Sequence, residues 1–410
     1  MALIVFSWWQ RALMLSGATF LFSFTVLAQA QLNHETTPGR SELALISQRE
    51  IVSLFNGTNL DGWVVRGGKA RYEVKDDEII GTATAKGGGN TFLCTEKEYG
   101  DFILELEIKA DKELNSGVQI RSHCFETETT YAFGNQTLKI PANRVHGYQV
   151  EVDNRPDRRW SGGLYEESRR GWLFSLPTNS LAGQAFQFGE WNKYRIQCVG
   201  SSIKTWINDV PATDLVDAES LRGFIGLQVH STDKAGLQVR FRNIRLRDLG
   251  QHHWATAWDC RSFDGMEQRG PAAWKLEDGV LHATQTESAL TNSMLLGTTP
   301  LLDSAVRFKY KIIKTGFSLN FLSELEGGQD QTGFNFSFLE RMGPTNVAKA
   351  RDWNTVIVAV QPTRLVVILN GHQLSDASIA RSSGVFPGLR LPVGPAAEVH
   401  FKDFEILNCP

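Results

Sequence analysis

The stretch HGYQVEVDN, residues 146–154, alternates apolar and polar side chains. Successive side chains of a β-strand point to opposite faces of a sheet, so this period of two predicts a half-buried strand. The residues predicted to face the core are Tyr148, Val150 and Val152. The residues predicted on the other face are Gln149, Glu151 and Asp153. Solvated strand faces usually mix Thr, Lys and Ser, so an amide followed by two carboxylates makes this face a candidate functional site.

Similar short alternating segments, separated by Gly, Asn and Asp, recur along the chain of 410 residues, whereas helical periodicity is scarce. This pattern is typical of an all-β protein. The 11 Trp and 24 Phe residues supply large side chains for its core. About a dozen short strands in each half of the chain cannot form one flat open sheet, so we predict packed antiparallel sheets of the jelly-roll kind.

The chain also contains an internal repeat of domain size. Its paired segments include YEVKDDEIIG (72–81) with WKLEDGVLH (274–282), and WNKYRIQCVGSSIKTWIND (191–209) with WNTVIVAVQPTRLVVILNG (353–371). The pairs keep their order along the chain. We therefore predict two tandem concanavalin/laminarinase-like jelly-roll β-sandwiches at residues 45–248 and 253–410, the second a degenerate repeat of the first.

Comparison of the two copies separates residues needed for packing from residues that could serve a site, because both copies must form the same fold. Apolar positions persist in both copies, and the alignment of SGVQIRSH (116–123) with TGFSLNFL (315–322) matches Arg121 to Asn320. Side chains with a charge or an imidazole on the outward strand faces persist mainly in the first copy. The outward polar residues of that copy are Gln119, Arg121, His123, Gln149, Glu151, Asp153, Gln228 and His230. We therefore predict a site on the first copy and a structural or docking role for the second.

Two carboxylates form the centre of this candidate site. Glu151 and Asp153 are two residues apart on one strand, so their side chains should emerge about 7 Å apart on the same face. Such a pair could be a glycosidase pair, a general base with an orienting partner, or a hard cation site completed by Gln149. Laminarinase-type jelly rolls carry E-x-D-x-x-E on such a strand, and here Pro156 replaces the last acid. That replacement disfavours ordinary glycoside hydrolysis, and a divalent cation stays an open alternative.

Other candidate residues suit an anionic intermediate bound beside a sugar. The guanidinium of Arg121 could hold an enolate or carboxylate oxygen in two hydrogen bonds. Three histidines are candidate acids or bases near neutral pH, namely His123, His146 and His230. The Gly-rich and aromatic stretch SGGLYEESRRGW (161–172) should form a loop beside the site. In it, Tyr165 could donate a hydrogen bond or stack on a sugar ring, and Trp172 could act as a platform.

The N-terminal 30 residues are predicted to lie outside the fold. RALMLSGATFLFSFTVLAQA (11–30) is an apolar run that follows one Arg and ends in an A-x-A cleavage pattern, which is typical of a signal peptide. A membrane anchor is the alternative. We expect an exported protein, either periplasmic or secreted. The net charge of −3 and the pI of about 6.3 lack the electrostatic signature of a nucleic-acid-binding protein. Of the five cysteines, Cys260 and Cys409 could form a disulfide.

Several motifs together resemble the 3-keto-disaccharide hydrolase family. They are SLFNGTNLDGWVV (53–65), SGVQIRS (116–122), GYQVEVDN (147–154) followed by GGLYE (162–166), WNKYRIQCVGSSIKTWIND (191–209) and GFIGLQVHS (223–231). The resemblance covers residues 51–249. It implies an exported protein with a concanavalin-like jelly roll that cleaves glycosides already oxidised at C3 of the sugar by a partner dehydrogenase.

The chemistry implied by this resemblance suits the candidate residues. A ketone at C3 acidifies the C2 hydrogen, a base removes that proton, and the enolate expels the substituent on C1. We assign Glu151 or His146 as the base and Arg121 as the group that holds the C3 oxygen. We assign His230 or Tyr165 as the group that assists departure of the C1 substituent. A cation on Glu151 and Asp153 could help Arg121. The residues predicted to bind the substrate are Gln119, His123, Gln149, Asp153, Gln228 and Trp172.

Two further expectations concern this site. The long insert CFETETTYAFGNQTLKIPANRV (124–145) is expected to reshape the pocket. The competing hypothesis is a non-catalytic module that binds carbohydrate or a partner protein. It accounts for aromatic platforms and amides, but it has less use for Arg121, Glu151 and two histidines together.

Overall fold

The computed structural model describes residues 49–84, 87–286, 289–322, 332–338, 347–379, 384–394 and 396–408. The predicted signal peptide and Cys409, one half of the predicted disulfide, lie outside these residues. Within the described ranges the chain is almost entirely β-structure, which confirms the predicted class. The short helix α3 (Leu181–Ala185) begins at Ser180, whose Oγ accepts a hydrogen bond from the main-chain N–H of Gly183. None of the described helices has the length and apolar character needed to cross a membrane.

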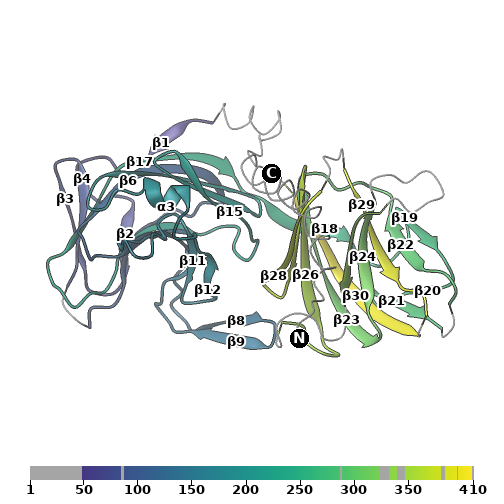
Figure 1. Cartoon of the computed structure of the whole chain (residues 1–410). Helices are drawn as coiled ribbons and strands as arrows, with labels where there is room; N and C mark the ends of the chain where they lie inside the picture. The colour runs from purple at the N-terminus through teal and green to yellow at the C-terminus, as the bar shows by residue number, and fades with distance from the viewer. Residues whose placement is uncertain are drawn as a thin grey trace, which may run out of the picture. The chain divides into compact units, whose positions relative to one another are not determined.

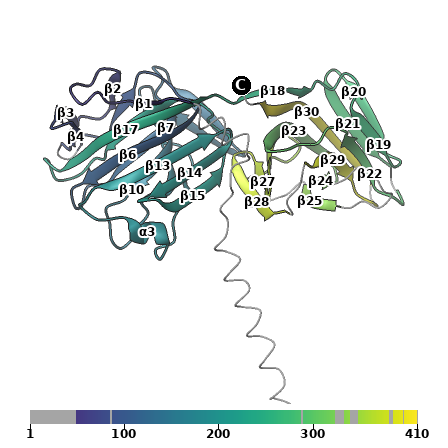
Figure 2. The ribbon, with the colours of Figure 1, turned by 90° about the horizontal axis from the view of Figure 1, so that it is seen from above.

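The first half of the chain forms two antiparallel sheets that face each other (Figure 1). The β6 sheet has the spatial order β15 (Val210–Val216), β14 (Ser202–Ile207), β13 (Asn192–Val199), β6 (Asp101–Ala110), β17 (Gln238–Gly250), β4 (Glu78–Thr82) and β3 (Arg71–Lys75), with β1 (Ile51–Ser53) also pairing with β17. The β10 sheet has the order β12 (Gly171–Phe174), β11 (Leu164–Glu167), β10 (His146–Val152), β7 (Ser116–His123), β16 (Phe224–Val229), β5 (Thr91–Thr95) and β2 (Trp63–Gly67). Figure 2 shows β17, β6, β13, β14 and β15 running side by side. A separate hairpin, β8 (Thr129–Phe133) and β9 (Gln136–Ile140), comes from the predicted insert.

The second half forms two sheets with corresponding strand orders. The β23 sheet has the order β28 (His372–Ser378), β27 (Arg364–Leu369), β26 (Asn354–Gln361), β23 (Ser304–Lys314), β30 (Ala397–Asn408), β21 (Val280–Gln285) and β20 (Ala273–Glu277), with β18 (His253–Trp258) also pairing with β30. The β24 sheet has the order β25 (Thr332–Phe338), β24 (Phe317–Leu322), β29 (Phe386–Leu391), β22 (Ser293–Gly297) and β19 (Met266–Arg269). Each strand of these sheets has a counterpart at the same place in the first half. Their origin as one duplicated unit stays a prediction.

Side-chain alternation places the cores as predicted. Tyr148, Val150 and Val152 are fully buried and belong to the apolar cluster between the β6 and β10 sheets. Leu104 and Ile196 contribute to the same cluster from the β6 sheet. A separate cluster fills the second sandwich. Because burial of apolar surface is the main stabilising term, each pair of sheets is held by its own core.

Two asparagines recur at matching positions in the paired segments 191–209 and 353–371, and in each segment they are joined by a hydrogen bond. Asn208 turns with a positive φ of 49°, and its Oδ1 accepts a hydrogen bond from the N–H of Lys193 at 2.8 Å. Its Nδ2 donates to Oδ1 of Asn192 at 2.9 Å. Asn370, with φ of 48°, repeats this arrangement with Thr355 and Asn354. The two asparagines therefore close the same turn in both halves, since Asn tolerates the left-handed conformation.

One predicted alignment is off by two residues. Gly226 of β16 pairs with Gln119 of β7, and the corresponding Gly388 of β29 pairs with Asn320 of β24. Asn320 is therefore the counterpart of Gln119, and the predicted match between Asn320 and Arg121 is wrong. Short strands have similar apolar patterns when they are shifted by two, so alternation alone does not define the register.

Candidate functional site

A pocket of about 520 Å³ opens on the outward face of the β10 sheet. Its floor comes from β10 and β16, and its rim comes from β11, β12 and the loops before β5, before β7, after β10 and after β16. The lining residues are Asn90, Glu113, Asn115, Gln149, Glu151, Arg155, Arg158, Tyr165, Glu167, Trp172, Gln228, His230, Ser231 and Thr232. A polar cavity of this size can hold a small sugar.

Glu151 lies on the floor of this pocket with 5% of its surface exposed. Asn115 donates a hydrogen bond to its Oε1, and Nε2 of Gln149 donates to its Oε2 at 3.2 Å. Burial raises the pKa of Glu151 to about 7, although these two donors oppose the rise. A carboxyl group of this kind is ionised in part at neutral pH and can accept a proton there.

Amides extend the floor on either side of Glu151. Gln149 pairs with Tyr165 on one side and with Gln119 on the other. Gln228 follows Leu227, which pairs with Val118, so its side chain emerges on the same face of the sheet. The side chain of Gln228 is completely buried, and within the described part of the chain neither its Oε1 nor its Nε2 has a hydrogen-bond partner. Such an amide on a pocket floor is prepared to bind a ligand hydroxyl group, because buried polar groups normally have partners.

Arg158 brings a positive charge to the pocket. Its Nη2 donates to Oδ1 of Asp153 at 2.7 Å, and its guanidinium lies 4.6 Å from the ring centre of Trp160. Its Nε atom is buried and has no partner among the residues that the structure describes. The loop that follows β10 therefore presents a planar cation beside Glu151.

An aromatic wall stands at the end of the sheet formed by β11 and β12. The rings of Tyr165 and Trp172 meet edge to face, with centres 5.4 Å apart, and Trp160 meets Trp172 in the same way at 4.8 Å. Trp172 keeps 37% of its surface exposed. A half-exposed ring on a pocket rim can pack against the C–H face of a sugar.

Residues 50–247 match the model of the family described as the 3-keto-alpha-glucoside-1,2-lyase-like domain. This part of the chain is similar to that family. The match confirms the predicted resemblance. No curated protein matches the chain.

Solved structures with similar regions have low identity to the chain. A protein of Parabacteroides distasonis ATCC 8503, classed provisionally as a glycosyl hydrolase, is 17% identical over 52% of this chain and 99% of its own length, with a TM-score of 0.33. The carbohydrate-binding module CBM66 of Bacillus subtilis is 13% identical over 47% of this chain and 98% of its own, with a TM-score of 0.32. A lichenase derived from a mouse hindgut metagenome is 10% identical over 38% of this chain and 98% of its own, with a TM-score of 0.29.

The lyase-like domain brings together most of the predicted residues of β10, β16 and the 161–172 stretch. The predicted residues that line the pocket are Gln149, Glu151, Tyr165, Trp172, Gln228 and His230. Nδ1 of His230 lies 2.6 Å from the carbonyl oxygen of Ser231, which leaves the other ring nitrogen for a ligand. Gln119 lies beside Gln149 on the neighbouring strand, is completely buried and does not line the pocket, so its predicted contact with substrate is wrong.

Arg121 was expected to hold an oxyanion, and the structure contradicts this. Its side chain is completely buried and donates hydrogen bonds to Asp101 and to the main-chain oxygens of Gly100 and Gly200. The pairing of β7 shifts at this point, and Arg121 has a positive φ of 47°. A bulge inserts an extra residue, so the period of two breaks and the side chain turns away from the outward face.

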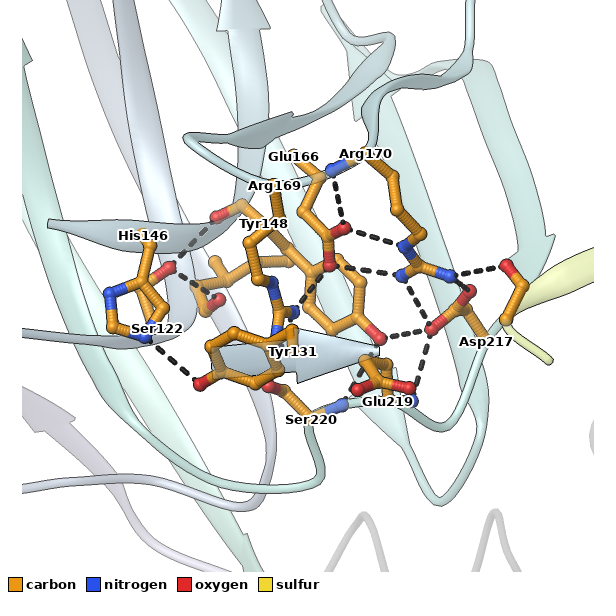
Figure 3. Close-up of polar contacts among 12 residues, drawn as sticks. Ser122, Tyr131, His146, Tyr148, Glu166, Arg169, Arg170, Asp217, Glu219 and Ser220 are labelled. Carbon is orange, nitrogen blue, oxygen red and sulfur yellow. Dashed lines mark hydrogen bonds and ion pairs between the residues drawn. The ribbon is translucent and has the colours of Figure 1, made fainter. Parts of the chain in front are cut away.

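His123 and His146 are also absent from the pocket lining. Phe125 stacks on His123, with ring centres 5.4 Å apart. The Tyr131 hydroxyl lies 3.0 Å from Nε2 of His146 (Figure 3). Burial lowers the pKa of His123 to about 4 and also lowers the pKa of His146. Because neither histidine lines the pocket and both pack against aromatic rings of the insert, the structure does not support the predicted roles of His146 as base and His123 as ligand contact. Phe125 and Tyr131 belong to the insert, which covers this end of the sheet.

Asp153 lies just after the end of β10 at Val152 and is completely buried. Its Oδ1 pairs with Arg158, and its main-chain N–H donates to Ser161. It does not line the pocket, so the predicted substrate contact is wrong. Within the described ranges, no group of three or more His, Cys, Asp or Glu side chains is arranged to bind a metal ion.

A buried charge network supports the hairpin that carries the aromatic wall. Arg170 binds Glu166 through Nε at 2.6 Å and Asp217 through Nη1 at 2.8 Å, and the hydroxyl of Tyr148 also donates to Asp217 (Figure 3). The guanidinium of Arg169 pairs with Glu166. Because Glu166 is adjacent to Tyr165, this network fixes the place of the pocket rim.

Sequence reasoning missed eight of the lining residues, and all of them except Glu167 lie in loops. Asn115 directly precedes the quoted stretch SGVQIRSH, and Arg158 belongs to the basic loop that follows β10. Loop side chains have no period to mark them, although their position at the ends of candidate strands was a usable signal. The other missed lining residues are Asn90, Glu113, Arg155, Glu167, Ser231 and Thr232.

Proposed function

We propose that the lyase-like domain cleaves 3-keto-glycosides by removing the C2 proton and expelling the substituent on C1. The observation that carries the proposal is the buried Glu151 on the pocket floor, held by two amide donors and having a pKa of about 7. The family match supports a carbohydrate-related, glycosidase-like role. A sugar dehydrogenase must supply the substrate, because the C3 ketone is what acidifies the C2 hydrogen.

The first step transfers a proton from carbon to Glu151. Glu151 takes the C2 hydrogen, and the electron pair of the C2–H bond forms an enolate whose charge lies on the C3 oxygen. Arg158 replaces Arg121 as the cation that stabilises this oxygen, since its guanidinium reaches the pocket and retains a free Nε donor. No step requires a metal ion.

The second step breaks the C1–O bond. The enolate re-forms the ketone, a C1=C2 double bond appears, and the leaving oxygen takes a proton from Tyr165 or His230, both of which line the pocket. The product is a keto-glycal, and later addition of water would make the net reaction a hydrolysis. Gln149 and Gln228 would bind the sugar hydroxyl groups.

The deciding experiment compares a 3-keto-glucoside with its unoxidised parent glucoside. We expect release of the C1 substituent from the keto form alone, because only the ketone acidifies C2. Exchange of the C2 hydrogen with deuterated water should also require the keto form. Release from the parent at a comparable rate would contradict the proposal.

The matched variants are Glu151→Gln and Glu107→Gln. Loss of the base should lower kcat by roughly 10²–10⁴. Glu107 pairs with Arg242 on the other sheet, so its replacement should leave turnover unchanged. Full activity of Glu151→Gln would show that the base has been assigned to the wrong residue.

A second candidate function is carbohydrate binding without turnover. The half-exposed Trp172 and the unpartnered amide of Gln228 favour it. It predicts that the keto sugar and its parent bind equally well and that neither is cleaved.

A further inference from the structure

A chain of hydrogen bonds leads from the interior of the β10 sheet to Glu151. Oγ of Ser122 donates to Oε1 of Gln119 at 2.7 Å, Nε2 of Gln119 donates to Oε1 of Gln149 at 2.7 Å, and Nε2 of Gln149 donates to Glu151. All four residues are buried. We call Ser122, Gln119 and Gln149 the amide relay. Ser122 and Gln119 do not line the pocket, so they act on a substrate only through Glu151.

Two glycines make room for the relay. A Cβ atom at Gly117 would lie 2.5 Å from Cδ of Gln149, and one at Gly226 would lie 3.2 Å from Cβ of Gln119. Because Gln119 pairs with both Gln149 and Gly226, the two amides lie side by side on one face of the sheet. Sequence and register therefore place the relay where its bonds can form.

The relay has a direction when Glu151 is ionised. A carboxylate only accepts hydrogen bonds, so Gln149 must turn its NH2 group toward Glu151 and its oxygen toward Gln119. Gln119 must then turn its own oxygen toward Ser122, whose hydroxyl donates to it. Asn115 donates to the other oxygen of Glu151, so both oxygens of the anion have donors.

The same residues can hold the protonated carboxyl group with every bond reversed. The O–H of Glu151 would donate to the oxygen of Gln149, whose NH2 group would donate to Gln119. The NH2 group of Gln119 would donate to Oγ of Ser122. The hydroxyl of Ser122 then has acceptors for its proton in the main-chain oxygens of Ile120 and Tyr148, each 3.1 Å away.

We propose that Ser122 and Gln119 are positioning residues for Glu151, and that the relay reverses its direction when Glu151 gains or loses a proton. The proposal rests on the proposed function in one respect, because it takes the C2 hydrogen of the keto sugar as the source of that proton. It gives Gln119 a role that does not involve contact with the sugar. The relay keeps the carboxyl oriented in both protonation states, so orientation need not be re-established in each cycle.

A substitution of Ser122 tests the positioning role, because its expected effect on the pKa of Glu151 differs from a general loss of stability. With alanine at position 122, only main-chain oxygens remain at the far end of the relay, so Gln119 turns its NH2 group toward them. That direction matches the protonated Glu151, and the pKa of Glu151 should rise by about one unit, the equivalent of one typical hydrogen bond. Ser116→Ala is the matched control, because Ser116 is a buried serine of the same strand whose Oγ donates to the main chain of Gln228 and does not touch the relay.

The other groups that act on Glu151 stay in place in these variants. The titratable and charged groups around Glu151 on its own strand, the neighbouring strands, the opposite sheet and the pocket loops are Asp153, Arg155, Arg158, Tyr165, Glu167, Tyr194, Glu113 and His230. None of them has a hydrogen bond with Ser122 in the structure. A shift of the titration can therefore be attributed to the relay.

The experiment follows the side-chain carboxyl carbon of Glu151 by ¹³C NMR from pH 4 to 9 in the full chain. The resonance is assigned by its loss in Glu151→Gln. We expect the midpoint to rise in Ser122→Ala and in Gln119→Leu, to stay at the wild-type value in Ser116→Ala, and to be restored in Ser122→Thr, which keeps the hydroxyl. The acid limb of kcat/KM for a 3-keto-glucoside should move by the same amount.

Equal midpoints in wild type, Ser116→Ala and Ser122→Ala would overturn the proposal. Gln119→Leu gives the same comparison if Ser122→Ala does not fold. The NMR titration needs no turnover, so a wild-type protein that cleaves no keto-glycoside would refute the proposed function while the titration still decides whether the relay acts on Glu151.

Discussion

At the scale of single residues, the pocket places polar groups where burial makes them reactive. Glu151 is almost completely removed from water, and its pKa rises from an ordinary 4.5 to about 7. Gln228 is completely buried and has no partner for its amide among the described residues. Burial of these two polar groups lowers the stability of the folded protein. A proton that binds to Glu151, or a ligand hydroxyl group that binds to Gln228, replaces the solvation that burial has removed.

Glu151 should therefore destabilise the protein at high pH. Because its pKa is higher in the folded chain than in the unfolded chain, its stabilising contribution is complete below about pH 4.5 and is lost as pH rises through about 7. We expect Glu151→Gln to raise the free energy of unfolding by about 3 kcal/mol at pH 9 and to leave it nearly unchanged at pH 4. Urea unfolding at the two pH values measures this. An equal effect at both would mean that Glu151 titrates normally.

Gln228 should contribute to binding at a cost in stability. In Gln228→Met we expect KM for a keto-glycoside to rise about tenfold through loss of a hydrogen bond, and the free energy of unfolding to rise by about 1–3 kcal/mol because an unpartnered buried amide is removed. Gln285→Met is the control, because the buried amide of Gln285 binds Pro392 and Ser293 in the second sandwich. That variant should lose stability and keep its KM. The reverse pattern would remove Gln228 from the site.

At the scale of elements, the insert decides which part of the β10 sheet is available. The segment that contains β8 and β9 supplies Phe125 and Tyr131, which cover His123 and His146. Strand alternation predicts the outward face for His123 but not for His146, which has the parity of Tyr148. A register shift between His146 and Tyr148 pairs His146 with His123, and the insert covers both, so the histidines titrate as buried groups.

Removal of the ring that stacks on His123 should restore ordinary titration. In Phe125→Ala, water reaches the imidazole, and we expect the pKa of His123 to rise from about 4 toward 6.5. The His Cε1–H resonance followed by ¹H NMR against pH reports this shift. Turnover at pH 8 should not change, because His123 is neutral there in both proteins. A pKa that stays near 4 would show that other groups bury His123.

Individual strands show where the alternation of apolar and polar residues predicts the direction of a side chain correctly and where it does not. It assigned Tyr148, Val150 and Val152 to the core correctly, because β10 is regular from Tyr148 to Val152. It failed at Arg121, where a bulge changes the direction of the side chain, and at Asp153, which lies beyond the strand. A bulge leaves no trace in a pattern of apolar and polar residues.

At the scale of the whole molecule, every residue that lines the pocket lies between positions 90 and 232. The two sandwiches have separate cores, and their sheets share a strand order. The match to the family model covers residues 50–247 and so lies within the first sandwich. All residues that the proposed mechanism uses therefore lie in the first sandwich.

This division leads to a prediction for two fragments. We expect residues 45–250 to fold and to cleave a 3-keto-glucoside with kcat/KM similar to that of the full chain, and residues 251–410 to be inactive. Circular dichroism should show β-structure in both fragments. A folded but inactive first fragment would mean that the second sandwich contributes to the site.

The sequence by itself determined the all-β class, the core faces of the regular strands, the resemblance to the family and the shared face of Glu151, Gln149 and Gln228 that lines the pocket. These features follow from the period of two and from short motifs, which are local properties of the chain. Only the tertiary structure decided that Arg121, His123 and His146 lie outside the pocket and that Arg158 and Asn115 lie inside it. A bulge, a covering insert and the path of a loop depend on contacts between distant segments, and a pattern of neighbouring residues does not record such contacts.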